Sequence, residues 1–214
     1  MDHRQGACLL LVDLQIDFMP DGALPVADGD ALIAPIRSLL ESHGFDSIVA
    51  TQDWHPARHI SFAGSHDGRK PFETMELYGH PQVLWPPHCV AGTRGAALHP
   101  QLPLDKVSAI VRKGMDPTVD AYSGFRNNWN ERGERPPTGL GGYLKELGIV
   151  KVYVCGLARD FCVRWTAEDA AALGFETSVL WDLTRGVDPA RDAEIRRTLI
   201  SRSIQVVDST TLPP

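Results

Sequence analysis

The chain has 214 residues, of which 43% are hydrophobic and 22% are charged, and its formal net charge is −6. This composition fits one soluble globular domain, and the negative charge argues against binding to nucleic acids or anionic membranes. The four cysteines form no CxxC pair and are too few for a disulfide framework. Because the apolar run Ala7–Val12 is too short for a signal peptide or a membrane span, a cytoplasmic protein is expected.

Short apolar runs alternate along the chain with stretches of helical spacing. The first run, Ala7–Leu14, is continuously apolar, as in a strand buried on both faces of a parallel sheet. A helix over Asp30–His43 follows and ends at Gly44. The later elements are predicted as strands Ser47–Thr51 and Ser108–Val111, helix Gly139–Leu147, strand Lys151–Cys155, helix Asp160–Leu173, strand Thr177–Trp181, helix Pro189–Ser201 and strand Gln205–Val207.

This alternation predicts an α/β fold, a single-domain three-layer αβα sandwich with a mostly parallel sheet of about six strands over residues 1–214. In such sheets, ligands bind beyond the carboxyl ends of the strands. Two stretches are long for loops, about 53–105 and about 122–138. The first is rich in His, Trp and Pro and is expected to be functional. In the second, residues 126–137 are either a lid or a mobile surface loop.

Three residues of reactive types follow apolar strands, where the ligand crevice is expected. Asp13 closes the first strand, Lys113 ends AIVRK, and Cys162 lies just inside the helix after KVYVC. Taken singly, they read as a turn former, a surface lysine and a small core residue. Their shared position favours a site instead. Desolvation would raise the pKa of Asp13 toward that of a general base, Lys113 would be a fixed cation, and the helix N-terminus would lower the thiol pKa of Cys162.

A second cluster comes from the first long loop. DWHPARH supplies Asp53, His55 and His59, and WPPHC adds His88. Their spacing cannot place them on one helix face, but a proline-punctuated loop can wrap them around one ion. One carboxylate and three imidazoles suit zinc, iron(II) or manganese. The alternative is that these are loop histidines that cap turns.

The motifs stand in the order VDLQIDF, TQDWHPARHISF, WPPHCVAGT, RKGMDPTVDAYSGF and GLARDFCV. In this order the sequence resembles the nicotinamidases, also called pyrazinamidases, among the isochorismatase-like cysteine hydrolases. The resemblance runs from about Ala7 to Asp208. Its most specific part is the pairing of DWHP with WPPHC, because the wider superfamily does not generally carry it.

The resemblance implies a covalent site. Asp13, Lys113 and Cys162 are similar to the family's catalytic triad. The backbone N–H groups of Ala158 and Cys162 would form the oxyanion hole, and a cis peptide bond would join Leu157 to Ala158. Arg159 departs from the family pattern, since many relatives have a small hydroxyl residue there, which leaves the helix cap to Asp160.

The resemblance also implies a metal and a ring-binding pocket. Asp53, His55, His59 and His88 match the ligands of one divalent ion, with zinc preferred over iron(II) or manganese. Phe18 and Trp85 match aromatic residues that sandwich the substrate ring, and Tyr122 lines the same pocket.

The implied reaction is hydrolysis of nicotinamide to nicotinate and ammonia through a cysteine thioester, in NAD salvage, with pyrazinamide as a further substrate. The expected partner is this small molecule, without nucleic acid or membrane; a homo-oligomer stays open. One alternative is a hydrolase of the same superfamily that acts on an N-carbamoyl compound or a vinyl ether, against which the full metal set argues. The other is a non-catalytic metal-binding or interaction protein, which predicts no reactive thiol.

Overall fold

The computed structural model describes residues 6–212 of the chain. Its centre is a six-stranded sheet in the order β5-β2-β1-β6-β7-β8, in which every pair of neighbouring strands is parallel. The predicted single-domain α/β fold with a parallel sheet is therefore confirmed. The strands are β1 (Ala7–Val12), β2 (Ser47–Asp53), β5 (Ala109–Lys113), β6 (Lys151–Leu157), β7 (Glu176–Arg185) and β8 (Gln205–Val207).

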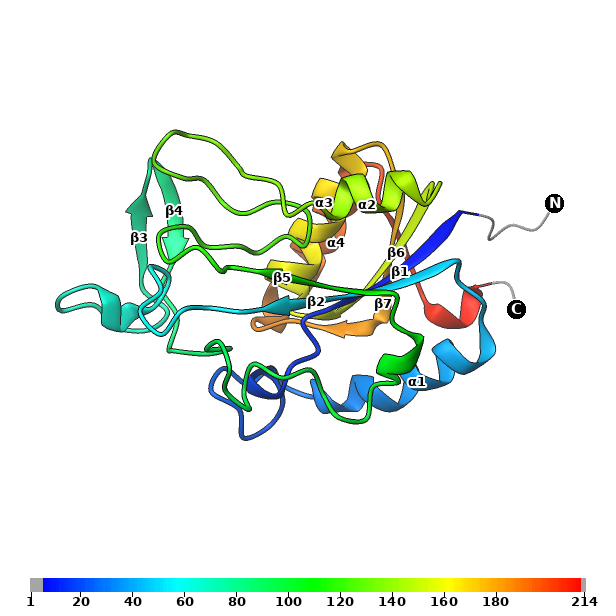
Figure 1. Ribbon diagram of the computed structural model, residues 1–214, viewed down its shortest axis with the longest axis horizontal. Helices are drawn as coiled ribbons and strands as arrows, with labels where there is room; N and C mark the ends of the chain where they lie inside the picture. The colour runs from blue at the N-terminus through cyan, green and yellow to red at the C-terminus, as the bar shows by residue number, and fades with distance from the viewer. Residues whose placement is uncertain (1–5, 213–214) are drawn as a thin grey trace.

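Helices cover both faces of this sheet. The α-helices are α1 (Ile33–Ser42), α2 (Leu140–Glu146), α3 (Arg164–Ala172) and α4 (Asp192–Ser201). Figure 1 shows α1 on one face and α2, α3 and α4 on the other. The shorter helices are the 3-10 turns Ile16–Phe18, Asp30–Leu32, Ala63–Ser65, Leu104–Lys106, Pro189–Arg191 and Ser209–Thr211, and the π-helical turn Arg159–Val163. In the described part of the chain, every helix is too short or too polar to cross a membrane.

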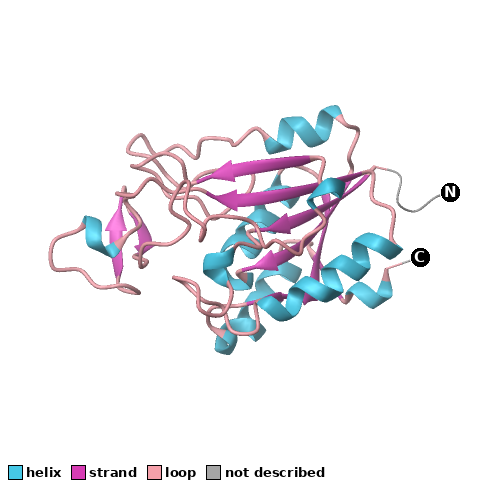
Figure 2. Cartoon of the chain, turned by 60° about the horizontal axis from the view of Figure 1, so that its bottom comes forward, coloured by secondary structure: helices cyan, strands magenta, loops and turns pink. Residues whose placement is uncertain are grey.

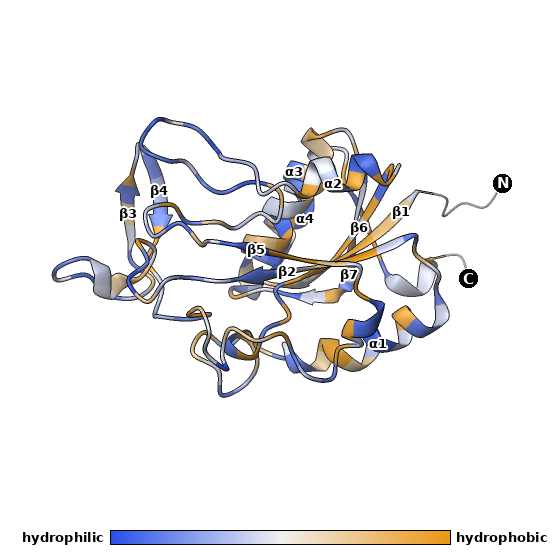
Figure 3. Ribbon diagram, in the orientation of Figure 1, coloured by the Kyte–Doolittle hydropathy of each residue, from blue (hydrophilic) through white to orange (hydrophobic). Residues whose placement is uncertain are grey.

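The strand order reverses between β1 and β6, which lie at the centre of the sheet. All six residues of β1 are buried, and β6 is buried from Val154 to its end, because helices cover both faces. In Figure 3, β1 and β6 carry mainly hydrophobic colours. Connections leave a crevice at the carboxyl ends of the strands where the order reverses, and Figure 2 shows the strands pointing toward the end where the long loops gather.

The strand ends differ from the sequence predictions in an informative way. The prediction ended the second and third strands at Thr51 and Val111, before polar residues, but β2 and β5 continue to Asp53 and Lys113. Asp53 and Lys113 are partners across the parallel ladder. Their polar side chains meet each other at the crevice, so both strands extend beyond their last apolar residue.

The long loop at 53–105 contains a small sheet that the sequence did not reveal. Strands β3 (Thr74–Leu77) and β4 (His80–Val83) pair antiparallel. Tyr78 and Gly79 between them both have positive φ, as a tight two-residue turn between antiparallel strands requires. The hairpin was missed because its strands have four residues each and are half exposed, so they give no clear periodic signal.

Candidate active site

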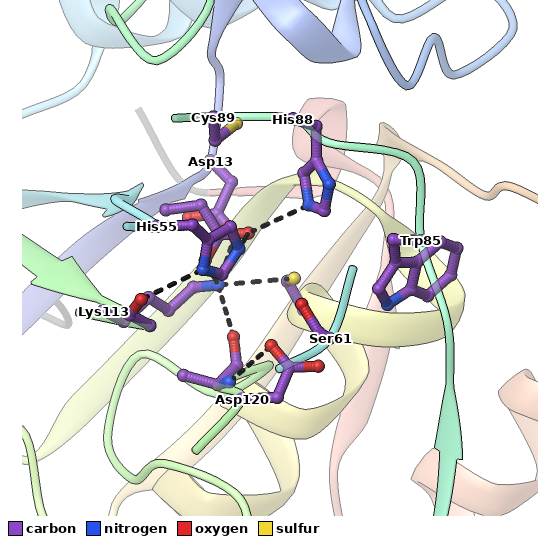
Figure 4. Close-up of polar contacts among 12 residues, drawn as sticks. Asp13, His55, Ser61, Trp85, His88, Cys89, Lys113 and Asp120 are labelled. Atoms are coloured by element: carbon purple, nitrogen blue, oxygen red, sulfur yellow. Dashed lines mark hydrogen bonds and ion pairs between the residues drawn. The ribbon is translucent and has the colours of Figure 1, made fainter. Parts of the chain in front are cut away.

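Four side chains, three at strand ends and one in the turn after β6, meet at the carboxyl edge of the sheet. The Nζ atom of Lys113 lies 2.9 Å from Oδ2 of Asp13, 2.6 Å from Oδ1 of Asp53 and 3.5 Å from the sulfur of Cys162. It also donates to the backbone oxygen of Ala121 at 2.9 Å. An oxygen of each carboxylate and the Cys162 sulfur all lie within 4.8 Å of one another. The convergence that the strand-end positions predict is therefore present in the structure (Figure 4).

The sheet itself brings these residues together. Asp13 follows the last residue of β1, and its backbone has a φ of 47°. Its carboxylate accepts a hydrogen bond of 2.6 Å from the hydroxyl of Thr51 on β2, which fixes its direction. On the other side, the pairing of Val12 with Gly156 brings β1 beside the strand that leads into Cys162. Because neighbouring parallel strands end at the same edge, residues about 150 positions apart in the chain meet there.

Gly156 makes this close approach of β1 and β6 possible. It has a φ of +113°, and a Cβ atom at this position would lie 2.1 Å from the backbone oxygen of Val12. Another residue would push β6 away from β1, so the glycine is required by packing as well as by its backbone conformation.

Burial sets the protonation of the acid and the thiol. Burial raises the pKa of Asp13, and the ammonium of Lys113 offsets this only in part. Burial also raises the pKa of the Cys162 thiol well above its usual value, against the opposing effect of Lys113. The expectation that the helix N-terminus would lower this pKa is wrong, because desolvation outweighs it. The resting site thus holds a neutral thiol that needs a neighbouring base.

Lys113 stays charged although its side chain is fully buried. Burial alone would lower its pKa, but Asp13 and Asp53 outweigh burial and raise it well above the usual value. For Asp53, burial is outweighed by Lys113 and His55, which hold its pKa far below the normal range. The result is a fixed ammonium between two carboxyl groups, of which Asp13 has the raised pKa and Asp53 the lowered one, so that Asp13 is the better proton acceptor.

The second predicted cluster lies beside this group. Oδ2 of Asp53 lies 3.5 Å from Nε2 of His55 and 3.9 Å from Nε2 of His88. These three residues are buried and offer ligand atoms within 4.8 Å of one another. His59 belongs to a neighbouring group, in which its ring lies within the same distance of His55 and Asp120. His55 is thus common to both groups.

Each histidine is oriented through its Nδ1 atom. Nδ1 of His55 bonds to the oxygen of Gly114 at 3.0 Å, and that of His88 bonds to the oxygen of Pro86 at 2.8 Å. Nδ1 of His59 bonds to the hydroxyl of Ser61 at 2.7 Å, and its Nε2 lies 3.2 Å from the backbone oxygen of Val119. Ligating histidines in proteins are held in this way by the ring nitrogen that does not bind the metal. Burial lowers the pKa of His59 and brings that of His88 to about 4, so both rings are neutral at neutral pH and able to bind a metal.

A hollow of about 370 Å³ opens onto both clusters. Its walls include Cys162, Ala158, Asp53, His55 and His88, together with the three predicted ring-contacting residues, Phe18, Trp85 and Tyr122. His59, Asp13 and Lys113 are not among its walls; the last two lie behind Cys162. Sequence reasoning missed Leu24, Asp120, Phe161 and Val187, which also line the hollow. Of these, only Phe161 had a sequence signal, since it directly precedes Cys162.

Asp120 is the most polar of the missed residues. Its Oδ2 accepts a hydrogen bond of 2.7 Å from the side-chain amide of Gln82 on β4, and the same amide lies 3.1 Å from the hydroxyl of Tyr122. That hydroxyl also accepts from the indole of Trp85 at 3.3 Å. The β3–β4 hairpin is therefore tied by buried hydrogen bonds to two walls of the hollow.

The turn that carries Cys162 tests the predictions made for the cis peptide bond, for Arg159 and for Asp160. The peptide bond between Leu157 and Ala158 is cis, as the resemblance implied. Arg159 points away from the hollow: its guanidinium donates to Thr184 and stacks 4.0 Å above the ring of Trp181. Arg159, where the sequence departs from the family pattern, is therefore not a wall of the hollow. The expected helix cap at Asp160 is also wrong, because its carboxylate bonds to the backbone of residues 187 and 188 instead.

A buried thiol, a carboxyl group and an ammonium meet beside a hollow at the edge of a parallel sheet. This arrangement is typical of a hydrolase with a covalent nucleophile. Residues 7–210 match the isochorismatase domain, and the chain belongs to this family. Within it, the sequence groups with the nicotinamidases. It is 47% identical to a nicotinamidase of Acinetobacter baylyi, over 88% of this chain and 85% of the relative.

Solved structures give the same grouping. A nicotinamidase–pyrazinamidase of Acinetobacter baumanii has a TM-score of 0.92 and 44% identity, and covers 99% of this chain and 100% of its own. A yeast nicotinamidase bound to the inhibitor nicotinaldehyde has a TM-score of 0.87 and 36% identity, over 94% and 99% of the two chains. A pyrazinamidase of Pyrococcus horikoshii in complex with zinc has a TM-score of 0.75 and 37% identity, over 95% and 99%.

Proposed function

We propose that this chain is an amidohydrolase that converts nicotinamide to nicotinate and ammonia, and pyrazinamide to pyrazinoate, in NAD salvage. The observation that carries the proposal is the position of the Cys162 sulfur, which faces an aromatic-walled hollow on one side and Lys113 and Asp13 on the other. A flat heteroaromatic ring would lie between Phe18 and Trp85, which both line the hollow. The names of the similar proteins give the substrate class.

Acylation begins with Cys162 as a thiol, because burial favours its protonated form. Asp13 accepts the thiol proton as the Cys162 sulfur attacks the amide carbon, and Lys113 stabilises the charges of the two groups. The N–H groups of Ala158 and Cys162 hold the negative charge that develops on the amide oxygen. Asp13, whose pKa is raised by burial, then gives the proton to the leaving nitrogen. Ammonia departs, and the acyl group remains on sulfur as a thioester.

Deacylation uses the same groups in reverse. Asp13 is again a carboxylate after ammonia has left, and it removes a proton from a water molecule that attacks the thioester carbon. The same two N–H groups hold the second tetrahedral oxygen. When the C–S bond breaks, the proton on Asp13 returns to the sulfur of Cys162, and the carboxylic acid product is released. The cycle consumes one water and returns the enzyme to its starting protonation state.

One divalent metal ion is proposed at Asp53, His55, His59 and His88, with zinc preferred over iron(II) or manganese. The residues fit such an ion: Asp53 keeps its charge, and His55, His59 and His88 are each oriented through Nδ1. When bound, a divalent ion supplies a Lewis-acidic position for the ring nitrogen of the substrate. Asp53 also bonds to Lys113, so the metal group and the reactive group share one carboxylate.

The proposed enzyme acts on a small molecule in the cytoplasm. Its partner is a small carboxamide, and neither nucleic acid nor a membrane is required for the reaction. A cytoplasmic location agrees with cysteines that are all free and buried in the described chain.

Ammonia release by the purified protein tests this function. We expect turnover of nicotinamide and of pyrazinamide, little ammonia from an N-carbamoyl amine, and about one divalent ion per chain by elemental analysis of the same sample. Preferential turnover of the N-carbamoyl amine would assign a different hydrolase of the family. A protein with no turnover and no thiol that reacts with iodoacetamide would be a binding protein.

A further inference from the structure

The side chain of Asp160 stands out in the turn that carries the nucleophile. It is fully buried, and within residues 6–212 its partners are two backbone N–H groups rather than a cation. Oδ1 accepts from Val187 and Oδ2 accepts from Asp188, each at 2.9 Å. Burying a carboxylate is costly unless its oxygens are hydrogen-bonded. The fold therefore keeps this charge in one defined arrangement, with both oxygens used.

These two hydrogen bonds connect parts of the proposed site that are distant in the sequence. Asp160 lies between Ala158 and Cys162, whose N–H groups are the proposed oxyanion donors. Val187, which Asp160 holds, lines the hollow together with those two residues. The Asp160 carboxylate thus connects two segments: the turn that carries the oxyanion donors, and the segment at Val187 that lines the hollow.

The turn itself is tight and leaves little freedom for independent adjustment. The backbone oxygen of Ala158 accepts the N–H groups of both Phe161 and Val163 at 3.0 Å. A movement of Asp160 must therefore tilt Ala158 and Cys162 with it. Oxyanion donors act through their direction and distance, and loss of one such donor lowers kcat by about 10²–10³.

We infer that Asp160 is a positioning residue, which aims the N–H groups of Ala158 and Cys162 at the oxyanion by anchoring their turn to the backbone at Val187 and Asp188. The inference rests on the proposed function. In D160N, an amide NH₂ group faces a backbone N–H, so one hydrogen bond is replaced by a contact between two donors. The turn then relaxes, and the two oxyanion donors lose their alignment.

The test separates the oxyanion site from the pocket. Nicotinaldehyde accepts the Cys162 sulfur at its carbonyl carbon, the thiol proton moves to Asp13, and the aldehyde oxygen becomes the oxyanion. Its inhibition constant therefore reports on the oxyanion donors, whereas the inhibition constant of nicotinate reports on the pocket. For D160N, we expect kcat with nicotinamide to fall about 10- to 100-fold and nicotinaldehyde to bind weaker by a similar factor. The KM and the inhibition constant of nicotinate should stay within about threefold.

Asp182 offers a matched control, because its carboxylate also accepts a backbone N–H, from Ser209 at 2.7 Å, outside the turn. D182N should leave kcat and the nicotinaldehyde constant unchanged, even where it lowers the melting temperature. D160E, which keeps the charge but moves it, provides a second folded variant and should show the same split to a smaller degree.

Two results would overturn the inference. One is a D160N or D160E enzyme with kcat within about twofold of the unsubstituted enzyme. The other is an equal loss of affinity for nicotinaldehyde and nicotinate, which would reduce Asp160 to general support of the pocket. Failure of the proposed function is seen separately, as an unsubstituted enzyme that releases no ammonia from nicotinamide.

Discussion

The edge of the sheet and the wall of the hollow are built in different ways. Asp53 and Lys113 end β2 and β5, Cys162 follows β6, and the contact between Asp53 and Lys113 follows from the strand register. Trp85 and Tyr122 lie in long connections. The Tyr122 hydroxyl accepts a hydrogen bond from Gln82 of the β3–β4 hairpin, and the Trp85 indole donates to the same hydroxyl. In Figure 3 the central strands carry mainly hydrophobic colours, whereas β4 is largely hydrophilic.

This difference indicates that the sheet edge and the wall have separate functions, catalysis and substrate recognition. Groups that exchange protons at short distances are placed at the edge of the central sheet, because small displacements between them would be most damaging. Groups that recognise a ring lie on loops, which can change without disturbing the sheet. Substitutions at the edge should therefore reduce kcat and stability, and substitutions in the wall should act mainly on KM.

The largest effect is expected at Cys162. C162A removes the nucleophile, so kcat should fall by at least about 10⁴-fold while the protein still binds nicotinate. Steady-state ammonia assays and calorimetric titration with nicotinate measure the two quantities. C8A, a change at a buried cysteine on the far end of β1, is the control and should keep near-normal kcat. A C162A enzyme with ordinary turnover would end the covalent scheme.

Lys113 should show how far activity and stability depend on the same contacts. K113M leaves Asp13 and Asp53 facing each other without the ammonium, so we expect loss of activity and about 3–5 kcal/mol of lost unfolding free energy. Urea denaturation measures the second quantity. K70M, at an exposed lysine, should cost less than about 0.5 kcal/mol. Equal stability of K113M and the unsubstituted enzyme would show that this group is not part of the folding core.

The sequence predicted the edge of the sheet better than the wall. Asp13, Lys113 and Cys162 could be found because strand ends of a parallel sheet face one crevice, and each follows an apolar run. Asp120 and Gln82 could not, because neither lies in a periodic segment and their partnership depends on a hairpin of two four-residue strands. The thiol pKa was mispredicted for a related reason: burial is a property of the assembled site and is not visible in a local helix start.

Metal removal should affect recognition more than chemistry. Dialysis against a chelator is expected to raise the KM for nicotinamide about tenfold, equivalent to about 1.4 kcal/mol, since the ring nitrogen loses its ligand. Benzamide, which has the same carboxamide on a ring without nitrogen, is the control substrate, and its KM should not respond. Returning zinc should restore the original KM for nicotinamide. If both substrates lost kcat equally, the metal group would belong to the chemistry instead.

Gln82 should give the smallest of these effects and the most specific one. Q82L removes the donor to Asp120 and Tyr122 and leaves the buried Oδ2 of Asp120 without this hydrogen bond, at a cost of about 1–3 kcal/mol in stability. We expect the KM for nicotinamide to rise about fivefold, with kcat changed less than twofold. Q101L, at an exposed glutamine, serves as the control. A fall in kcat without a change in KM would contradict the division between edge and wall.

The most direct measurement is mapping of the acyl group on the enzyme. Nicotinamide turnover is quenched with acid within the first cycle, and the digested protein is analysed by mass spectrometry. A nicotinoyl group on the peptide that contains Cys162, absent from the same peptide of the C162A variant, is the expected result. A nicotinoyl group on another side chain, or an enzyme that releases ammonia without any acylated peptide at every quench time, would contradict the assignment of Cys162 as the nucleophile.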